Sequence, residues 1–224
     1  ESWQVLTQNR PFRRLIAAYL INGLANGLPA TLIIFFVDYV LQDNGNVGPY
    51  LFAYFLCGVI AIPLWVRAAN HFGKHRTWCA AMLFACLIFA AVPFVGAGDS
   101  TLYMAICILT GLGFGADLAL PASMQADVVD QDTLKTGQQR TGLYFALWGM
   151  ATKLSLALAA GIGFPLLSLS GFDPPAATAT TPLVMLYAIV PIVFKLIAVV
   201  IMWNHPLDRD SVAHIREQIQ VSRT

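Results

Sequence analysis

Four ionisable side chains lie inside long apolar stretches of this sequence: Asp38, Asp117, Lys153 and Lys195. A charged group near the middle of a lipid bilayer costs about 3 kcal/mol or more unless it faces protein or water. Groups retained at that cost can bind a solute, exchange a proton or pair with one another. We therefore take these four as the first candidates for a functional site.

Lys153 is the deepest of them, because it lies too far from either end of its apolar stretch to reach an interface comfortably. Ala146, Gly149, Ala157 and Ala160 share its helical face. Small residues allow a neighbouring helix or a cavity to approach. We therefore expect Lys153 to point inward rather than at lipid, either in a functional role or in a salt bridge between two helices.

The other three ionisable groups have different settings. Asp117 lies at a depth similar to that of Lys153, so the two could share a proton or neutralise each other. Lys195 is close enough to the end of its stretch for us to expect it to snorkel to the interface, in a structural role. Asp38, beside Tyr39, is either an interfacial carboxylate exposed to water or a site residue.

The first apolar stretch carries a polar face, because Tyr19, Asn22, Gly23, Asn26 and Gly27 recur at spacings of three and four residues. Asn side chains donate and accept hydrogen bonds, which suits a path for hydroxylated or zwitterionic solutes. Amide bonding between helices along a small-residue groove is the alternative. The candidate pathway residues are Lys153, Asp117, Tyr19, Asn22, Asn26, Trp148 and Thr152.

The composition places these groups in a membrane protein. Of the 224 residues, 58% are hydrophobic and 11% are charged, whereas a soluble domain carries roughly 25% charged residues. The 13 Lys and Arg nearly balance the 12 Asp and Glu without a basic block, which argues against a nucleic-acid partner. The four cysteines are too few for a disulfide scaffold.

Six stretches are long enough to cross a bilayer as helices, which takes about 20 residues. Alternation in ten-residue units, typical of a membrane β-barrel, is absent. We therefore predict an all-α membrane protein. The predicted spans are residues 12–41, 48–69, 77–96, 102–124, 142–169 and 182–203.

The basic residues predict the orientation. Laid out alternately, the six spans leave eleven of the thirteen Lys and Arg on one side, whereas the opposite connections carry only Asp43, Asp99 and Asp173. The positive-inside rule then makes both termini cytoplasmic. We predict a bundle over residues 1–204 and an amphipathic cytoplasmic tail over 205–224. No signal peptide precedes the first span, and a chain beginning with Glu1 is expected to be a piece of something longer.

Two spans share a short pattern. Residues 23–30 (GLANGLPA) and 115–122 (GADLALPA) have the same Gly-to-Pro step, three spans apart. Interrupted helices at equivalent positions are typical of inverted three-plus-three transporter repeats. We expect six helices in such a repeat.

Three longer segments resemble one family. These are residues 9–12 (NRPF), the basic segment 63–78 (PLWVRAANHFGKHRTW) and the segment 124–158, which begins MQADVVDQDTLKTGQQRTG. They resemble the glycoside-pentoside-hexuronide:cation symporters, the melibiose-permease-like branch of the major facilitator superfamily. The resemblance covers nearly the whole chain, but only the carboxyl-terminal six-helix half of a twelve-helix transporter.

The resemblance implies roles for individual residues. Lys153 would be the intramembrane lysine associated with cation and sugar coupling. The segments 63–78 and 124–141, read as cytoplasmic loops, would supply gate or loop-packing groups. Those groups are Arg67, Lys74, Arg76, Asp127, Asp130, Lys135 and Arg140.

The function expected from the sequence is that of a secondary active transporter half, which carries a sugar or glycoside together with a cation by alternating access. We expect a bacterial inner-membrane protein in contact with lipid. Its partner would be a missing amino-terminal half or a second copy forming a dimer. No cofactor is expected, and Na⁺ or H⁺ would bind mostly outside this chain. A non-transporting scaffold is the alternative.

An intramembrane enzyme is disfavoured. In residues 113–117 (GFGAD), Ala116 interrupts the GxGD pattern, HExxH and GxSxG are absent, and every His lies outside the spans. His71 and His75 are four residues apart, but the adjacent Lys74 and Arg76 argue against a metal site.

Overall fold

The computed structural model describes residues 9–138, 140–172 and 180–206, which are helical with short connections and contain no strand. Six of its helical rods are long and apolar enough to cross a membrane, as predicted. The rods are α2 (Arg10–Phe35) with the π-helical turn η1 (Phe36–Leu41), α3 (Val47–Phe72), α4 (Lys74–Phe89) with the 3-10 turn η2 (Val92–Phe94), α5 (Ser100–Thr136), α6 (Thr141–Leu169), and α7 (Thr181–Val184) continued by η3 (Met185–Ile189) and α8 (Val190–Trp203).

Local chemistry explains where several helices begin and end. The Asn9 side chain accepts a hydrogen bond from the Phe12 amide at 3.0 Å and so caps α2, whose first turn also carries a proline. Gly73 alone separates α3 from α4, in a conformation with φ of 90° that residues with a Cβ rarely adopt. Gly137, with φ of 68°, ends α5.

Two predicted loops are wrong. The segment after residue 124 continues α5 to Thr136, so Asp127, Asp130 and Lys135 lie on a helix and only residues 137–140 connect α5 to α6. The basic segment 63–78 is likewise helical on both sides of Gly73. The sequence predicts loops here because these segments are too hydrophilic for lipid. A helix that extends beyond the bilayer into water still forms its own backbone hydrogen bonds, so a polar segment can remain helical.

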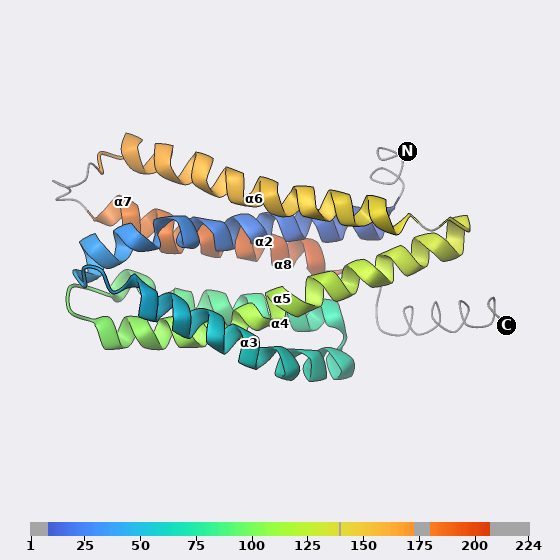
Figure 1. The fold of residues 1–224 in the computed structure, drawn as a ribbon, viewed down its shortest axis with the longest axis horizontal. Coiled ribbons are helices and arrows are strands. Elements are labelled where there is room, and N and C mark those ends of the chain that lie inside the picture. Colours follow the sequence, from blue (N-terminus) through green and yellow to red (C-terminus); the bar gives the residue numbers. More distant parts are fainter. Residues whose placement is uncertain (1–8, 139, 173–179, 207–224) are drawn as a thin grey trace.

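The packing follows the predicted repeat. The first helix of each set of three packs on the second and third helices of the other set: α2 lies along α6 and α8, and α5 lies along α3 and α4. In Figure 1, α2, α6 and α8 accordingly lie on one side of the molecule and α3, α4 and α5 on the other. Contacts of α4 with α8 and of α2 with α5 join the two groups.

Glycines set the spacing of the closest pairs of helices. A Cβ added at Gly111 of α5 would lie 2.4 Å from the Tyr54 carbonyl oxygen of α3, and one at Gly115 would lie 2.5 Å from that of Gly58. On the other side of the molecule, a Cβ at Gly27 of α2 would lie 2.7 Å from the Cβ of Ala159 on α6. In both groups the backbones meet because a side chain is missing.

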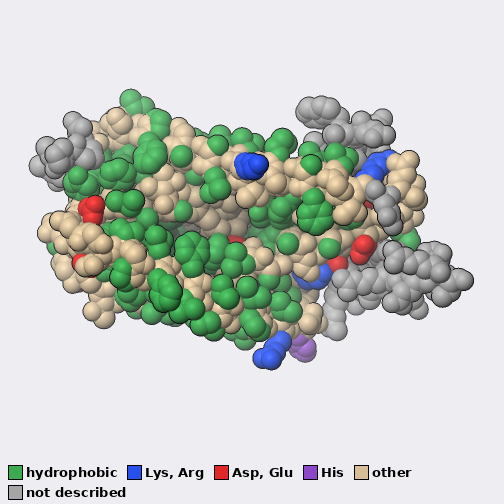
Figure 2. All heavy atoms as spheres, in the orientation of Figure 1, with side chains coloured by type: hydrophobic (Ala, Val, Ile, Leu, Met, Phe, Trp, Pro, Cys, Tyr) green, Lys and Arg blue, Asp and Glu red, His purple; other side chains and the backbone are tan. Residues whose placement is uncertain are grey.

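The apolar core has two main parts. One surrounds Phe12, Trp78 and Met124 near the end of the bundle where α2 begins, and the other surrounds Phe36, Tyr103 and Tyr187 near the opposite end. Figure 2 shows hydrophobic side chains spread along the visible surface between the two ends, with few charged side chains among them. Such a surface suits a lipid environment.

The described charges at the bundle ends follow the predicted asymmetry. Arg10, Lys74 and Arg140 lie at the end where α2 begins, which we call the basic end, whereas Asp43 and Asp99 lie at the other. Which end faces the cytoplasm remains a prediction. The predicted tail lies almost wholly outside the described residues, since the description ends at residue 206.

Candidate functional site

A cavity of about 360 Å³ opens between the two parts of the core. Every long rod contributes to its lining. Tyr54, Phe55 and Phe114 belong to its aromatic wall, and Asn22 and Asn26 to its polar wall. Of the described residues that line it, only Asp117 and Lys195 are ordinarily charged at neutral pH.

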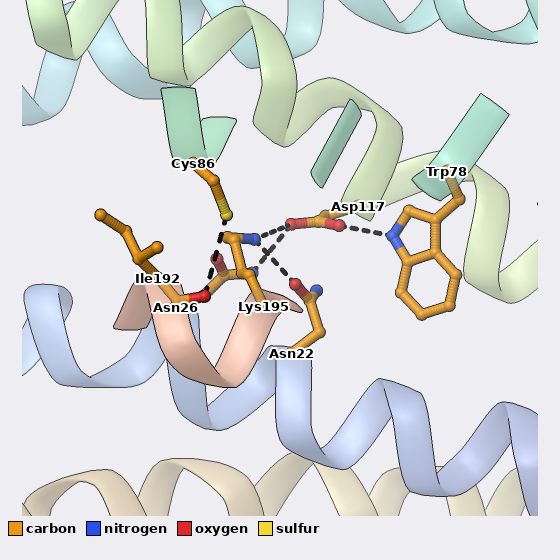
Figure 3. Close-up of polar contacts among 7 residues, drawn as sticks. All are labelled: Asn22, Asn26, Trp78, Cys86, Asp117, Ile192 and Lys195. Atoms are coloured by element: carbon orange, nitrogen blue, oxygen red, sulfur yellow. Dashed lines mark hydrogen bonds and ion pairs between the residues drawn. The ribbon is translucent and has the colours of Figure 1, made fainter. Parts of the chain in front are cut away.

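These two form the centre of a hydrogen-bonded network that joins four helices (Figure 3). The Lys195 ammonium on α8 lies 3.2 Å from Asp117 Oδ2 on α5 and donates to Asn22 Oδ1 on α2 at 2.7 Å. Asn26 Nδ2 donates to the same Asp117 oxygen at 2.9 Å. Trp78 Nε1 of α4 donates to the other oxygen, Oδ1, at 2.6 Å.

This arrangement stabilises both charges although their side chains are largely buried. The side chains of Lys195 and Asp117 are only 12% and 9% exposed. A buried ion pair balances its desolvation cost only when further hydrogen bonds satisfy the remaining polar atoms. Both carboxylate oxygens have neutral donors here, and the ammonium has an amide acceptor. The network is therefore neutral overall and well satisfied.

The prediction that Lys195 snorkels is wrong. Its ammonium bonds to Asp117 and Asn22 in the interior of the bundle. The suggested pairing of Asp117 with Lys153 is also wrong in this structure, because Lys195 occupies that position. Hydropathy gives the depth of a residue in the membrane but not the side of the helix that meets a neighbour, and here that side decided the partner.

Lys153 lies on an exposed face of α6 in the described bundle, so the expectation that it points inward fails for this half alone. A Cβ added at Gly149 on the same face would meet nothing within 4 Å. Small residues of α6 instead contact α2 from the buried face, where Ser155 and Ala159 lie against Gly23 and Gly27.

A second polar group joins α2 to α6 beside the cavity. The Tyr19 hydroxyl and Thr152 Oγ1 lie 2.9 Å apart, and both residues line the cavity. Trp148 stacks on the Tyr19 ring with the centroids 3.9 Å apart. The structure thus brings together Tyr19, Trp148 and Thr152, and places Asn22 and Asn26 on the adjoining wall.

Aromatic rings form the end of the cavity away from the basic end. The hydroxyls of Tyr103 and Tyr187 lie 2.5 Å apart, and Phe36 stacks on Tyr187 with the centroids 4.3 Å apart. In the nearby connection after η1, Asp43 accepts hydrogen bonds from Tyr50, Asn46 and Ser100 at 2.6, 2.5 and 3.0 Å. These bonds, that of Tyr50 foremost, hold the pKa of Asp43 below its ordinary value.

At the basic end, Lys74 at the start of α4 pairs with buried Asp127 of α5 and donates to the Ser123 carbonyl at 3.2 Å. Arg140 donates to Gln138 in the connection to α6. Asp130 is partly buried. The predicted gate residues left exposed are Arg67, Arg76 and Lys135.

His205 is buried beside this end, with its ring 6.3 Å from that of His75. Neither of its ring nitrogens has a hydrogen-bond partner among the described residues. Burial lowers the pKa of His205 to about 4, and the positive charges of His75 and Arg14 act in the same direction.

The described residues contain no group of three or more His, Cys, Asp or Glu that could hold a metal ion. Trp78 is the network member that sequence reasoning missed altogether. In the sequence it is the last residue of the basic segment 63–78, and no spacing pattern relates it to Asp117, which lies 39 residues away along the chain.

Comparison with known proteins gives this geometry a context. Residues 1–209 match the family model described as MFS/sugar transport protein. A glucuronide carrier protein homolog of Escherichia coli is 27% identical, over 92% of this chain and 46% of its own length. An uncharacterized symporter of Synechocystis sp. is 26% identical, over 97% and 42%. The human sodium-dependent lysophosphatidylcholine symporter 1 is 25% identical, over 98% and 41%. The chain therefore spans less than half the length of these relatives.

Proposed function

Because the chain belongs to the MFS/sugar transport protein family, we propose that it forms one half of a secondary active transporter. This half supplies one wall of a central solute site. A second six-helix bundle supplies the opposing wall, and the two rock about the site so that it opens to each side of the membrane in turn. The protein is not an enzyme in this proposal.

The observation that carries the proposal is the ion pair in the cavity. A structural helix bundle gains little from a pair such as Asp117 and Lys195, since apolar side chains of similar size are often at least as stabilising. Within the span region, such groups belong to solute and ion pathways. Here the pair lines a cavity that also offers the amides of Asn22 and Asn26.

The exposed position of Lys153 supports the presence of a second bundle. A lysine in the middle of a span is too costly to leave against lipid. Among the described residues Lys153 is exposed, and a Cβ added at Gly149 on the same face would have open space around it. We propose that this face meets the missing amino-terminal bundle, so that Lys153 lies on the pathway between the halves. A second copy of this chain in the same place is the alternative.

The solute is proposed to be a sugar or glycoside, and its uptake to be driven by Na⁺ or H⁺. The polar wall supports a solute rich in hydrogen-bonding groups, and a relative is named as a glucuronide carrier homolog. Another relative is named as a sodium-dependent symporter of lysophosphatidylcholine, so lipid-like solutes belong in any test. We place the protein in a bacterial inner membrane, with both termini cytoplasmic.

Uptake by the full-length protein in proteoliposomes tests this function. The assay uses a panel of labelled glycosides and lysophospholipids, with the Na⁺ and pH gradients imposed independently. We expect one solute class to accumulate against its gradient and Lys153→Ala to abolish the accumulation. Asp99→Asn, at an exposed connection, is the control and should accumulate solute like the parent. Failure of every solute to accumulate under either gradient refutes the proposal.

A further inference from the structure

The two charges in the cavity are held unequally. Asp117 keeps two neutral donors, Trp78 and Asn26, that do not depend on Lys195. Apart from Asp117, the Lys195 ammonium has one acceptor within hydrogen-bonding distance among the described residues, Asn22 Oδ1. An ammonium carries three N–H donors. Lys195 is therefore the member that can exchange its partner at lower cost.

From this geometry we infer that the cavity takes a solute bearing an oxyanion, a carboxylate or a phosphate, and that Lys195 binds it in exchange for Asp117. The inference rests on the proposed transport function and specifies the solute of the same site. When the ammonium turns to the oxyanion, its ion pair with Asp117 breaks. Asp117 then takes up a cation, H⁺ or Na⁺, with Trp78 and Asn26 still bonded to its oxygens.

The exchange conserves charge. Before binding, one ammonium and one carboxylate cancel. Afterwards a singly charged oxyanion cancels Lys195 and the entering cation cancels Asp117. Apart from the O–H bond that Asp117 forms when the cation is H⁺, only ionic and hydrogen bonds change. The solute without the cation leaves a carboxylate unpaired in a site that is 9% exposed, which is costly. Each ligand therefore strengthens the binding of the other, and this reciprocity is the coupling that a symporter needs.

Few other groups near Asp117 could bind the oxyanion or the cation. Within the described part of the chain, Tyr54 of α3 and Cys86 of α4 are the titratable groups besides Lys195 that interact with Asp117, and both are neutral near pH 7. A neutral solute would use the amides of the polar wall and leave the ion pair intact. The two kinds of solute therefore predict different behaviour of the pair.

The test compares matched probes on the purified full-length protein. Phenyl β-D-glucuronide and methyl phenyl phosphate each carry one negative charge, whereas phenyl β-D-glucoside is neutral. Dissociation constants are measured by titration calorimetry at several pH values, with and without Na⁺. One or both anionic probes should bind at least about tenfold more tightly than the glucoside, the gain expected of a charge-assisted hydrogen bond in a sheltered site. The arm that binds identifies carboxylate or phosphate.

Variants separate the roles of the two charges. Lys195→Met should remove the preference for the anionic probe, and Lys195→Arg should restore part of it. Asp117→Asn should keep the preference but lose the dependence of binding on pH or Na⁺. Ile197→Met, at an exposed position on α8, and Asp99→Asn are controls that should bind like the parent. If Lys195→Met does not fold, the same affinities are measured on Asp117→Asn and on the double variant Lys195→Met/Asp117→Asn.

Two results overturn the inference: neither anionic probe binds more tightly than the glucoside, or Lys195→Met keeps the full preference for the anionic probe. The transport function is judged separately. If the parent and Lys195→Met both accumulate a neutral glycoside, the transport function is supported and the anion exchange is refuted. If no solute accumulates but the anion-linked binding is found, the anion exchange is supported and the transport function is refuted.

Discussion

Removing both charges of the ion pair in the cavity should destabilise the protein by less than the sum of the two single removals. Removing one member of a buried pair costs about 3–5 kcal/mol, because the other is left as an uncompensated charge. Both side chains here are well under a third exposed, so the figure needs little reduction for solvent screening. Lys195→Met should lie near the low end, at about 3 kcal/mol, because Trp78 and Asn26 still bond to Asp117.

Asp117→Asn should cost about as much or more, since it leaves the ammonium with Asn22 as its remaining acceptor in the network. The double variant removes both charges and should cost at least about 2 kcal/mol less than the sum of the single variants. The free energies of unfolding come from denaturant titration of the full-length protein at neutral pH. Asp99→Asn, on the surface, should stay within about 0.5 kcal/mol of the parent. A double variant whose cost equals the sum would show that the two charges do not interact, and the description of the network would be wrong.

Three further outcomes follow from the structure. Gly111→Ala should destabilise the protein by about 1–3 kcal/mol or more, because its Cβ would lie 2.4 Å from a backbone oxygen of α3. Gly149→Ala has open space around it and should be neutral or stabilising by up to about 1 kcal/mol. Thermal unfolding of the two variants checks this. The pKa of His205 falls from 6.5 to about 4 in the folded protein, so protonation favours the unfolded chain. The free energy of unfolding should therefore fall by at most about 3 kcal/mol between pH 6.5 and pH 4. His205→Phe should flatten this part of the curve when the free energy of unfolding is measured against pH. Because the pKa of Asp43 is lowered in the folded protein, its carboxylate stabilises the fold above pH 3.8, and this stabilisation is lost as the pH falls through the lower folded value. Asp43→Asn should therefore make the free energy of unfolding less sensitive to acid. An unchanged sensitivity to acid would show that the hydrogen bonds to Asp43 do not stabilise the fold.

Hydropathy and helical periodicity were sufficient to predict the architecture. The six spans and the repeat follow from runs of apolar residues and from the shared Gly-to-Pro step, because a bilayer leaves helices as the main way to satisfy the backbone. The polar face of the first span was also predicted, and Asn22 and Asn26 line the cavity. Each of these is a property of one helix considered alone.

The centre of the site could not be predicted, because it depends on how helices meet. Lys195 looked free to reach an interface, and only the packing of α8 against α2 and α5 shows that its ammonium is held by Asn22 and Asp117. Lys153 looked central from its depth, yet its face is exposed in this half. Sequence gives the position of a charge along the membrane normal, whereas its partner is set by helix rotation and by neighbours distant in sequence.

The most direct test of the central claim, that Asp117 and Lys195 link a solute to a cation, compares two modes of transport in proteoliposomes containing the full-length protein. Accumulation driven by an imposed Na⁺ or pH gradient requires the cation to bind, whereas exchange of labelled for unlabelled solute does not require a gradient. We predict that Asp117→Asn abolishes gradient-driven accumulation and retains exchange. Gradient-driven accumulation by Asp117→Asn at the level of the parent would contradict the account.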